Sequence, residues 1–282
     1  MNTATKFAAF AAVLAVLFGG AALAGAAIGP DPSEDVADAP EEHSEMTSTE
    51  THAPDPVRGL AIAADDLRVV VDDPELRRGR EETLTFRIED ERGETVRDFD
   101  VEHEKRMHLI VARRDLTGFQ HLHPEQAADG SWRTPVRLDD AGSYRLFADF
   151  SHDEEARTLA TDLRVDGAAD LRPLPDPEPT AVSDGGYDVR LDAGAARPGQ
   201  EADLRFTITK DGTPIRTEPY LGAGGHLVAL RDGDLAFLHV HPTDDEAARF
   251  AATFPTAGRY RLFLQFKHAG TVQTVAFTQE VS

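Results

Sequence analysis

The chain of 282 residues contains no cysteine, three methionines and one tryptophan. Without cysteine it can form no disulfide, no thiolate metal site and no cysteine nucleophile, so its folded parts must be held together by packing. Basic residues are also scarce, because 29 Lys and Arg stand against 51 Asp and Glu, for a formal charge of -22. This charge argues against nucleic acid and anionic lipid surfaces as partners, since both attract basic proteins.

Motifs of the common enzyme classes are missing as well. The sequence has no G-x-S-x-G, no phosphate-binding loop and no H-E-x-x-H, and its carboxylates are spaced as on an acidic surface. The glycine-rich stretch 222–225 precedes an apolar run typical of a strand, which indicates a loop that permits close backbone approach. We therefore expect no catalytic residues and interpret the chain as a binding or structural protein.

The N-terminal residues 7–30 carry no charge. At about 1.5 Å per helical residue they are long enough to cross a hydrocarbon layer of about 30 Å. The same run contains Ala22-Leu23-Ala24, which resembles a signal-peptide cleavage site. We predict that residues 1–30 are a single-pass anchor with the rest of the chain facing outward from the cell membrane, or a cleaved signal that leaves the protein secreted or in the cell envelope.

Residues 31–58 are the next distinct segment. They contain nine acidic residues and one basic residue, together with many Pro, Ser and Thr. So few apolar side chains cannot offset the entropy lost on ordering, so we predict a disordered acidic linker.

An internal repeat occupies the remainder. The stretch HLIVARRDLTGFQHLHP at 108–124 returns as HLVALRDGDLAFLHVHP at 226–242, and AGSYRLF at 141–147 returns as AGRYRLF at 257–263. Short apolar runs separated by Gly, Pro and Asp predict about seven strands per repeat and no helices.

We therefore predict an all-β protein of two tandem immunoglobulin-like β-sandwiches, residues 59–166 and 184–282. Tyr144 and Tyr260 each follow a tight turn, where such sandwiches place a corner tyrosine that hydrogen-bonds nearby backbone. The segment 167–183 contains alternating prolines and predicts a stiff spacer, so we expect each repeat to fold by itself.

Histidines mark both repeats. Eight of the eleven histidines occupy equivalent positions: His108, His121, His123 and His152 in the first repeat, and His226, His239, His241 and His268 in the second. Asp232-Gly233 predicts a type I′ turn that places His226 opposite His239, and the equal spacing places His108 opposite His121. Because side chains alternate along a strand, three imidazoles of each repeat should then share one face, and His152 or His268 should join from a flanking strand.

Neutral imidazole is a common ligand of copper and zinc. We therefore predict one Cu(II) or Zn(II) site in each repeat, formed by the four histidines named above, and a tighter site in the second repeat because its turn is better preorganised. Cu(I) is disfavoured, since Met107 is the sole methionine within the repeats. Apart from the metal, and the membrane through residues 1–30, the sequence indicates no partner.

Two alternatives stay open. The histidines can simply pack and hydrogen-bond in a non-metal immunoglobulin-like module that serves structure or protein interaction in the cell envelope. Three histidines and a water would instead form the open coordination typical of a catalytic zinc.

The motifs also carry a family resemblance. The N-terminal membrane segment, the His-Leu and His-Leu-His-Pro motifs and Ala-Gly-x-Tyr-Arg-Leu-Phe resemble exported β-sandwich proteins akin to the YtkA-like and CopC-like copper-resistance domains. The resemblance covers most of residues 60–282 and implies metal binding or a role in maintaining the envelope. The methionine-rich copper motifs of some such proteins are absent here.

Overall fold

The computed structural model describes residues 57–238, 240–244 and 247–282, and these form strands, turns and loops without a helix. The predicted membrane or signal segment 1–30 and nearly all of the acidic linker 31–58 lie outside the described residues. Within the described part, no helix is long and apolar enough to cross a membrane.

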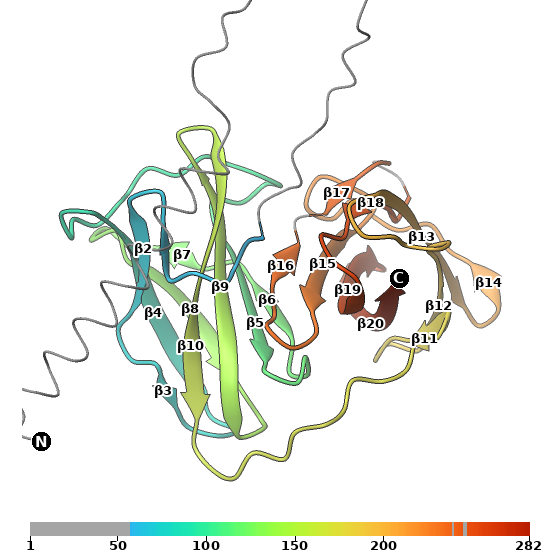
Figure 1. Ribbon diagram of the computed structural model, residues 1–282, viewed down its shortest axis with the longest axis horizontal. Helices are drawn as coiled ribbons and strands as arrows, with labels where there is room; N and C mark the ends of the chain where they lie inside the picture. The colour runs from blue at the N-terminus through green and yellow to red at the C-terminus, as the bar shows by residue number, and fades with distance from the viewer. Residues whose placement is uncertain (1–56, 239, 245–246) are drawn as a thin grey trace, which may run out of the picture. The chain divides into compact units, whose positions relative to one another are not determined.

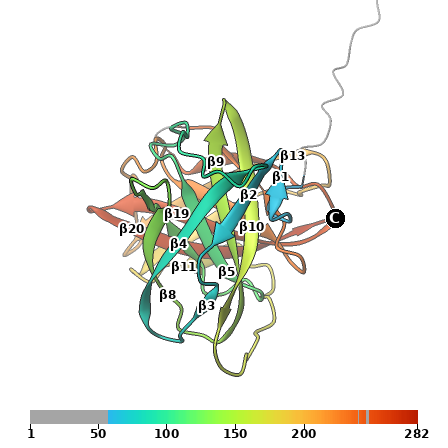
Figure 2. The same cartoon turned by 90° about the vertical axis from the view of Figure 1, so that its left-hand side faces the viewer.

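The first repeat is a two-sheet sandwich (Figures 1 and 2). Its first sheet has, in spatial order, β1 (Ala63–Ala64), β2 (Leu67–Val71), β4 (Glu81–Asp90), β8 (Trp132–Arg137) and β7 (Glu125–Gln126). Its second sheet has β3 (Glu75–Leu76), β10 (Glu155–Val165), β9 (Gly142–His152), β5 (His108–Arg113) and β6 (Gln120–Leu122). The alternation of Leu84, Phe86 and Ile88 along β4 points these side chains into the core between the sheets.

The second repeat has the same architecture. One sheet has β11 (Thr180–Val182), β12 (Tyr187–Asp192), β13 (Glu201–Lys210), β18 (Arg249–Thr253) and β17 (His241–Pro242), with β14 (Thr213–Pro214) paired to β13. The other has β16 (Phe237–Leu238), β15 (His226–Arg231), β19 (Gly258–His268) and β20 (Thr271–Val281). The order β16-β15-β19-β20 repeats the order β6-β5-β9-β10 of the first sandwich, so the predicted tandem all-β immunoglobulin-like fold is confirmed.

Both predicted corner tyrosines are present. The hydroxyl of Tyr144 donates to the carbonyl oxygen of Asp140 at 2.8 Å, and that of Tyr260 donates to the carbonyl oxygen of Thr256 at 2.9 Å. Each bond ties the start of a long strand to the turn before it. The two sandwiches therefore share this local device as well as their strand order.

The prediction that a spacer keeps the two sandwiches apart is wrong, because β5 and β15 are covered on both faces, whereas separate folding of each repeat stays a prediction. In β5, Leu109 and Val111 face the core of the first sandwich, whereas Ile110 and Ala112 face outward into a second cluster. We call this second cluster the shared apolar cluster. It contains Ile110, Ala112, Leu116, Phe147 and Ala160 from the first repeat and Val228, Leu230, Leu235, Phe237 and Phe263 from the second. The described residues accordingly all fall within one compact unit.

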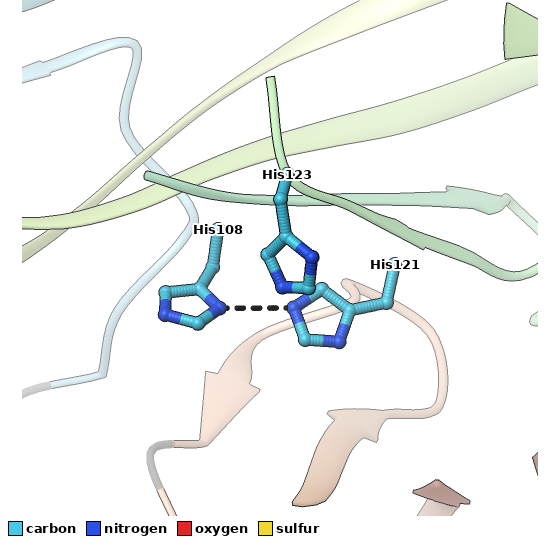
Figure 3. Close-up of side chains that lie close together, drawn as sticks. All are labelled: His108, His121 and His123. Carbon is cyan, nitrogen blue, oxygen red and sulfur yellow. Dashed lines mark hydrogen bonds between the residues drawn. The ribbon is translucent and has the colours of Figure 1, made fainter. Parts of the chain in front are cut away.

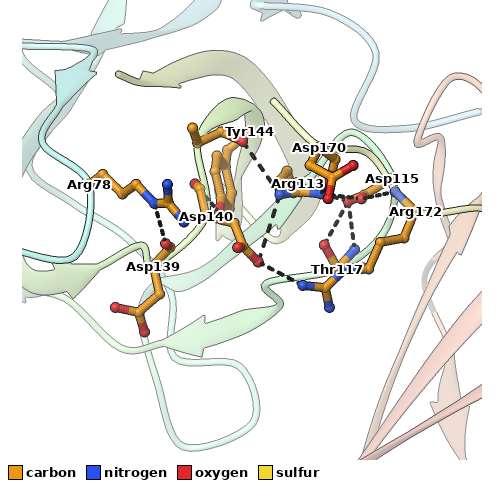
Figure 4. Close-up of polar contacts among 10 residues, drawn as sticks. Arg78, Arg113, Asp115, Thr117, Asp139, Asp140, Tyr144, Asp170 and Arg172 are labelled. Atoms are coloured by element: carbon orange, nitrogen blue, oxygen red, sulfur yellow. Dashed lines mark hydrogen bonds and ion pairs between the residues drawn. The ribbon is translucent and has the colours of Figure 1, made fainter. Parts of the chain in front are cut away.

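The expected spacer 167–183 is held by contacts rather than free. Arg113 is buried, and its guanidinium donates to both carboxylate oxygens of Asp115 and to the carbonyl oxygen of Asp170, as Figure 4 shows. Further along, Arg259 donates to the carbonyl oxygen of Leu174 at 3.1 Å. The second sandwich also begins earlier than predicted, because β11 starts at Thr180, inside the segment assigned to the spacer.

Candidate metal centre

Three histidines of the first repeat converge on one point (Figure 3). Each of His108, His121 and His123 offers one ring nitrogen, and the three atoms lie within 4.8 Å of one another. His108 comes from β5, His121 from β6, and His123 from the residues just after β6. His108 is buried, whereas the other two rings are partly exposed. Among the described residues this is the one group of metal-ligating side chains at such spacing.

The convergence was predicted, but the strand register behind it differs from the prediction. Ile110, not His108, lies opposite His121, so the observed pairing is shifted by two residues from the predicted one. A shift of two residues leaves every side chain on its original face, which is why the three histidines still meet.

The second hairpin shows the equivalent register, with Ala229 opposite Leu238. Asp232-Gly233 therefore does not form the predicted two-residue turn. Positive φ occurs at Leu116 and Gly118 in the first connection and at Gly233 and Leu235 in the second, not at Arg114-Asp115. The predicted ranking, with the tighter site in the second repeat, thus loses its physical basis.

The expected fourth ligands lie elsewhere. His152 makes a 2.8 Å hydrogen bond through Nδ1 to the carbonyl oxygen of Asp98, and His268 makes a 2.9 Å bond through Nδ1 to the hydroxyl of Tyr187. The reason is that His152 lies on the other face of its sheet from His108. His108 lies opposite Asp149 on the outer face of its sheet, and His152, an odd number of residues further, is on the core face.

The second repeat does not assemble an equivalent triad among its described residues. His241 is exposed and lies in β17, which belongs to the opposite sheet of the sandwich, and His239 lies outside the described residues. His226 instead approaches the first-repeat triad: its ring centroid is 4.7 Å from that of His121 and 5.7 Å from that of His108. The prediction of two separate sites is therefore replaced by one cluster that draws on both repeats.

Sequence comparison of the repeats also missed His103, which has no counterpart. Its ring centroid is 6.1 Å from that of His108 and 6.0 Å from that of His226. A tight turn with positive φ at His103 and Glu104 folds this loop back toward the cluster. No spacing rule within the sequence identifies such a residue, because its position depends on the turn.

Hydrogen bonds define which nitrogen of each ring faces the centre. His108 Nε2 lies 3.1 Å from the carbonyl oxygen of Glu102, which can only accept, so this nitrogen carries the hydrogen and Nδ1 carries a lone pair. His121 Nδ1 lies 2.7 Å from Oε1 of Gln265, which likewise makes Nδ1 the donor and leaves a lone pair on Nε2. The two lone-pair nitrogens, His108 Nδ1 and His121 Nε2, face each other at 3.1 Å.

The third ring adds another available nitrogen. Nε2 of His123 is buried and has no hydrogen-bond partner among the described residues. A buried polar atom without a partner is costly, so its presence beside two lone pairs requires a physical explanation. A cation at the centre provides one.

The electrostatic environment keeps these rings neutral. Burial, with the charges of His108 and His123, lowers the pKa of His121 to about 3. Burial, with His108 and Lys105, lowers the pKa of His123 to about 4. Burial also lowers the pKa of His226 well below its ordinary value. Near neutral pH the rings are therefore in the unprotonated form that binds metals.

One carboxyl group lies beside the cluster. Asp149 is opposite His108 in the β5-β9 ladder and accepts a 2.6 Å hydrogen bond from the Thr158 hydroxyl. Burial raises the pKa of Asp149, against the opposing effects of Thr158 and His108. Its counterpart in the second repeat is Gln265, which lies opposite His226.

The repeat is also evident in a family comparison. One family model, described as a domain of unknown function (DUF8832), matches residues 62–167 and again residues 180–282. The chain belongs to the DUF8832 family. Its two DUF8832 copies coincide with the two sandwiches, and the description names neither a metal nor a copper-resistance function. No curated protein sequence matches the chain significantly.

Solved structures with some similarity to the two DUF8832 copies share little sequence with them. An alpha-2-macroglobulin of Salmonella is 15% identical over 80% of this chain with a TM-score of 0.29, and this chain spans 15% of its length. The Escherichia coli adhesin FdeC is 15% identical, with 79% of this chain and 66% of the adhesin covered and a TM-score of 0.28. At this level of identity and superposition, neither likeness bears on function.

Proposed function

We propose that the protein binds one divalent transition metal, Cu(II) or Zn(II), through His108, His121 and His123. The observation that carries the proposal is the 3.1 Å approach of His108 Nδ1 to His121 Nε2 while an oxygen accepts from the other nitrogen of each ring. Metal-bound histidines use this arrangement, in which the second nitrogen donates to a carbonyl, amide or carboxylate oxygen and so orients the ring.

The distances suit such a metal. Two nitrogens at about 2.0–2.1 Å from a tetrahedral zinc lie about 3.3 Å apart, close to the separation of the two facing nitrogens. The donors are neutral imidazoles without sulfur, which favours Cu(II) and Zn(II) over Cu(I). We infer a binding role rather than catalysis, and the copper-handling function implied by the resemblance to YtkA-like and CopC-like domains belongs to this proposal.

The second candidate is a non-metal immunoglobulin-like module for structure or protein interaction. The contact between the Gln265 side-chain amide and His121 favours it. With the oxygen and nitrogen of that amide exchanged, the NH2 group donates to His121 Nδ1, and His121 Nε2 then donates to His108 Nδ1. That chain of hydrogen bonds is complete without a metal, although it leaves His123 Nε2 without a partner. The immunoglobulin-like fold of the two sandwiches fits this candidate directly, and the family description names no metal.

The location is part of the same proposal. We place both sandwiches outside the cytoplasmic membrane, tethered or released according to the fate of residues 1–30. The acidic composition, with its formal charge of -22, supports a role that attracts cations and involves no nucleic acid.

The decisive experiment measures metal binding by the full chain without an affinity tag. Zn(II) and Cu(II) are titrated into the wild type, His121→Ala/His123→Ala and the control His152→Ala/His268→Ala. We expect one metal per wild-type chain, affinity reduced at least about 100-fold in the first variant, and no change in the control, whose rings make their bonds elsewhere. Equal binding by all three proteins would leave the second candidate as the function.

A further inference from the structure

The second sandwich contributes side chains to the surroundings of the triad. His226 and Gln265 lie directly opposite each other in the β15-β19 ladder, so they share the face that carries Val228 and Phe263 into the shared apolar cluster. Gly225 permits this arrangement, because a Cβ at that position would lie 2.9 Å from the carbonyl oxygen of Gln265. The packing that joins the sandwiches therefore also brings Gln265 to His121.

Gln265 is held firmly in place. Its side chain is buried at 7% exposure, and its amide nitrogen donates to the Thr274 hydroxyl at 3.2 Å on the neighbouring strand β20. With the nitrogen so engaged, Oε1 faces His121 Nδ1 at 2.7 Å. In this orientation of the amide, the contact places a hydrogen on Nδ1 and directs the lone pair of His121 Nε2 toward His108 and His123.

His226 covers another side of the same centre. Its ring lies at an interplanar angle of 6° to that of His108 and at 29° to that of His121. No described residue hydrogen-bonds to its ring, which is partly buried among the surrounding histidines. The ring therefore shields the triad from solvent on the side of the second sandwich.

We propose that the metal centre is a composite of both sandwiches, in which Gln265 is a positioning residue that selects the metal-binding tautomer of His121. This inference rests on the proposed function, because it assigns a role to Gln265 at that same site. It also predicts one metal per chain instead of one per repeat, since the acceptor that the first-repeat triad needs is supplied by the second repeat.

The test uses the full chain with three substitutions. Gln265→Met keeps the approximate size but removes the acceptor, Gln265→Glu retains an acceptor oxygen, and Gln279→Met makes the same chemical change at an exposed position of β20. Zn(II) affinity is measured by competition with a chelator, and circular dichroism checks that each variant is folded. We expect Gln265→Met to weaken binding about 10–100-fold, Gln265→Glu to bind at least as tightly as the wild type, and Gln279→Met to be unchanged.

The outcomes separate the inference from the function on which it rests. Loss of binding in His121→Ala/His123→Ala with wild-type affinity in Gln265→Met overturns the positioning role and leaves the metal site standing. Equal weakening by Gln265→Met and Gln265→Glu also overturns it, because packing alone would then explain the loss. Wild-type binding in every variant refutes both proposals.

Discussion

Phe119 and Phe263 stack with ring centroids 4.0 Å apart and an interplanar angle of 6°, although they belong to different repeats. Phe119 precedes β6 and packs against the shared apolar cluster, whereas Phe263 lies in β19 and belongs to that cluster. The contact shows that the two sandwiches bury surface against each other as a protein core does. The histidine cluster lies at the edge of this contact, so the positions of its rings depend on how the two sandwiches pack.

Truncating the shared apolar cluster should destabilise both sandwiches together. Phe237 is 5% exposed and its ring centroid lies 5.6 Å from that of Phe147 in the first repeat. We expect Phe237→Ala to cost about 3–5 kcal/mol, whereas Val182→Ala, at a 65% exposed position, should cost little. Urea unfolding followed by fluorescence and circular dichroism should show one shifted transition. Two transitions, with only one of them shifted, would show that the repeats unfold independently.

The metal-free protein should lose stability in mild acid. The pKa of His121 is about 3 and that of His123 about 4 in the folded protein, whereas an unfolded histidine titrates near 6.5. Between these values the unfolded chain binds more protons, so the free energy of unfolding rises with pH there and is fully regained only above about pH 6.5. Buried Asp149, whose pKa is raised, acts in the opposite sense.

A histidine variant isolates this effect. The free energy of unfolding, measured between pH 7.5 and 4.5 in the presence of a chelator, should fall less steeply in His121→Gln than in the wild type. Tyr144→Phe, which removes a hydrogen bond remote from the histidines, should keep the wild-type pH dependence while lowering stability by about 0.5–1.5 kcal/mol. Identical slopes in the wild type and His121→Gln would contradict the lowered pKa of His121.

Replacing one partner of the buried ion pair in the first hairpin should lower stability more than replacing both partners. The side chains of Arg113 and Asp115 are 1% and 4% exposed. Asp115→Ala removes the bidentate partner of a buried guanidinium, leaving it the longer 3.7 Å contact with Asp140, and should cost about 3–5 kcal/mol, whereas Arg113→Met/Asp115→Leu should cost less. The exposed pair of Arg205 with Asp203 is the control, and Asp203→Ala should cost at most about 1 kcal/mol. Thermal unfolding of the four proteins checks this order, and a double variant less stable than the single one would refute it.

The proposed location has a direct test. A reporter active only outside the cytoplasm, fused after Ser282, should be active if, as we propose, the uncharged run 7–30 directs the following chain outward. Two arginines introduced in that run, at Val13 and Val16, should abolish the activity by preventing insertion. Activity of a cytoplasm-specific reporter at the same position would place the sandwiches inside the cell.

Much of the fold was readable from local sequence. The short apolar run Leu67–Val71 forms β2, as its β-branched composition favours, and the repeated Ala-Gly-x-Tyr-Arg-Leu-Phe motifs mark the start of β9 and β19. Strand alternation has a period of two, so His108, His121 and His123 were placed on one face even with the wrong register. The error in the hairpin connections came from reading Asp232-Gly233 as a two-residue turn.

Only the tertiary structure decided what each sheet face meets. His152 and His268 were assigned to the wrong face because alternation identifies two faces without saying which of them a partner covers. One signal was available: all six residues of β5 are buried, and an apolar run without alternation is typical of a strand covered on both sides. The sequence by itself therefore determined two sandwiches and three histidines on a common face. The packing of one repeat on the other, through contacts such as Gln265 with His121, determined that the cluster is single and shared, because such distant pairs leave no periodic trace in the chain.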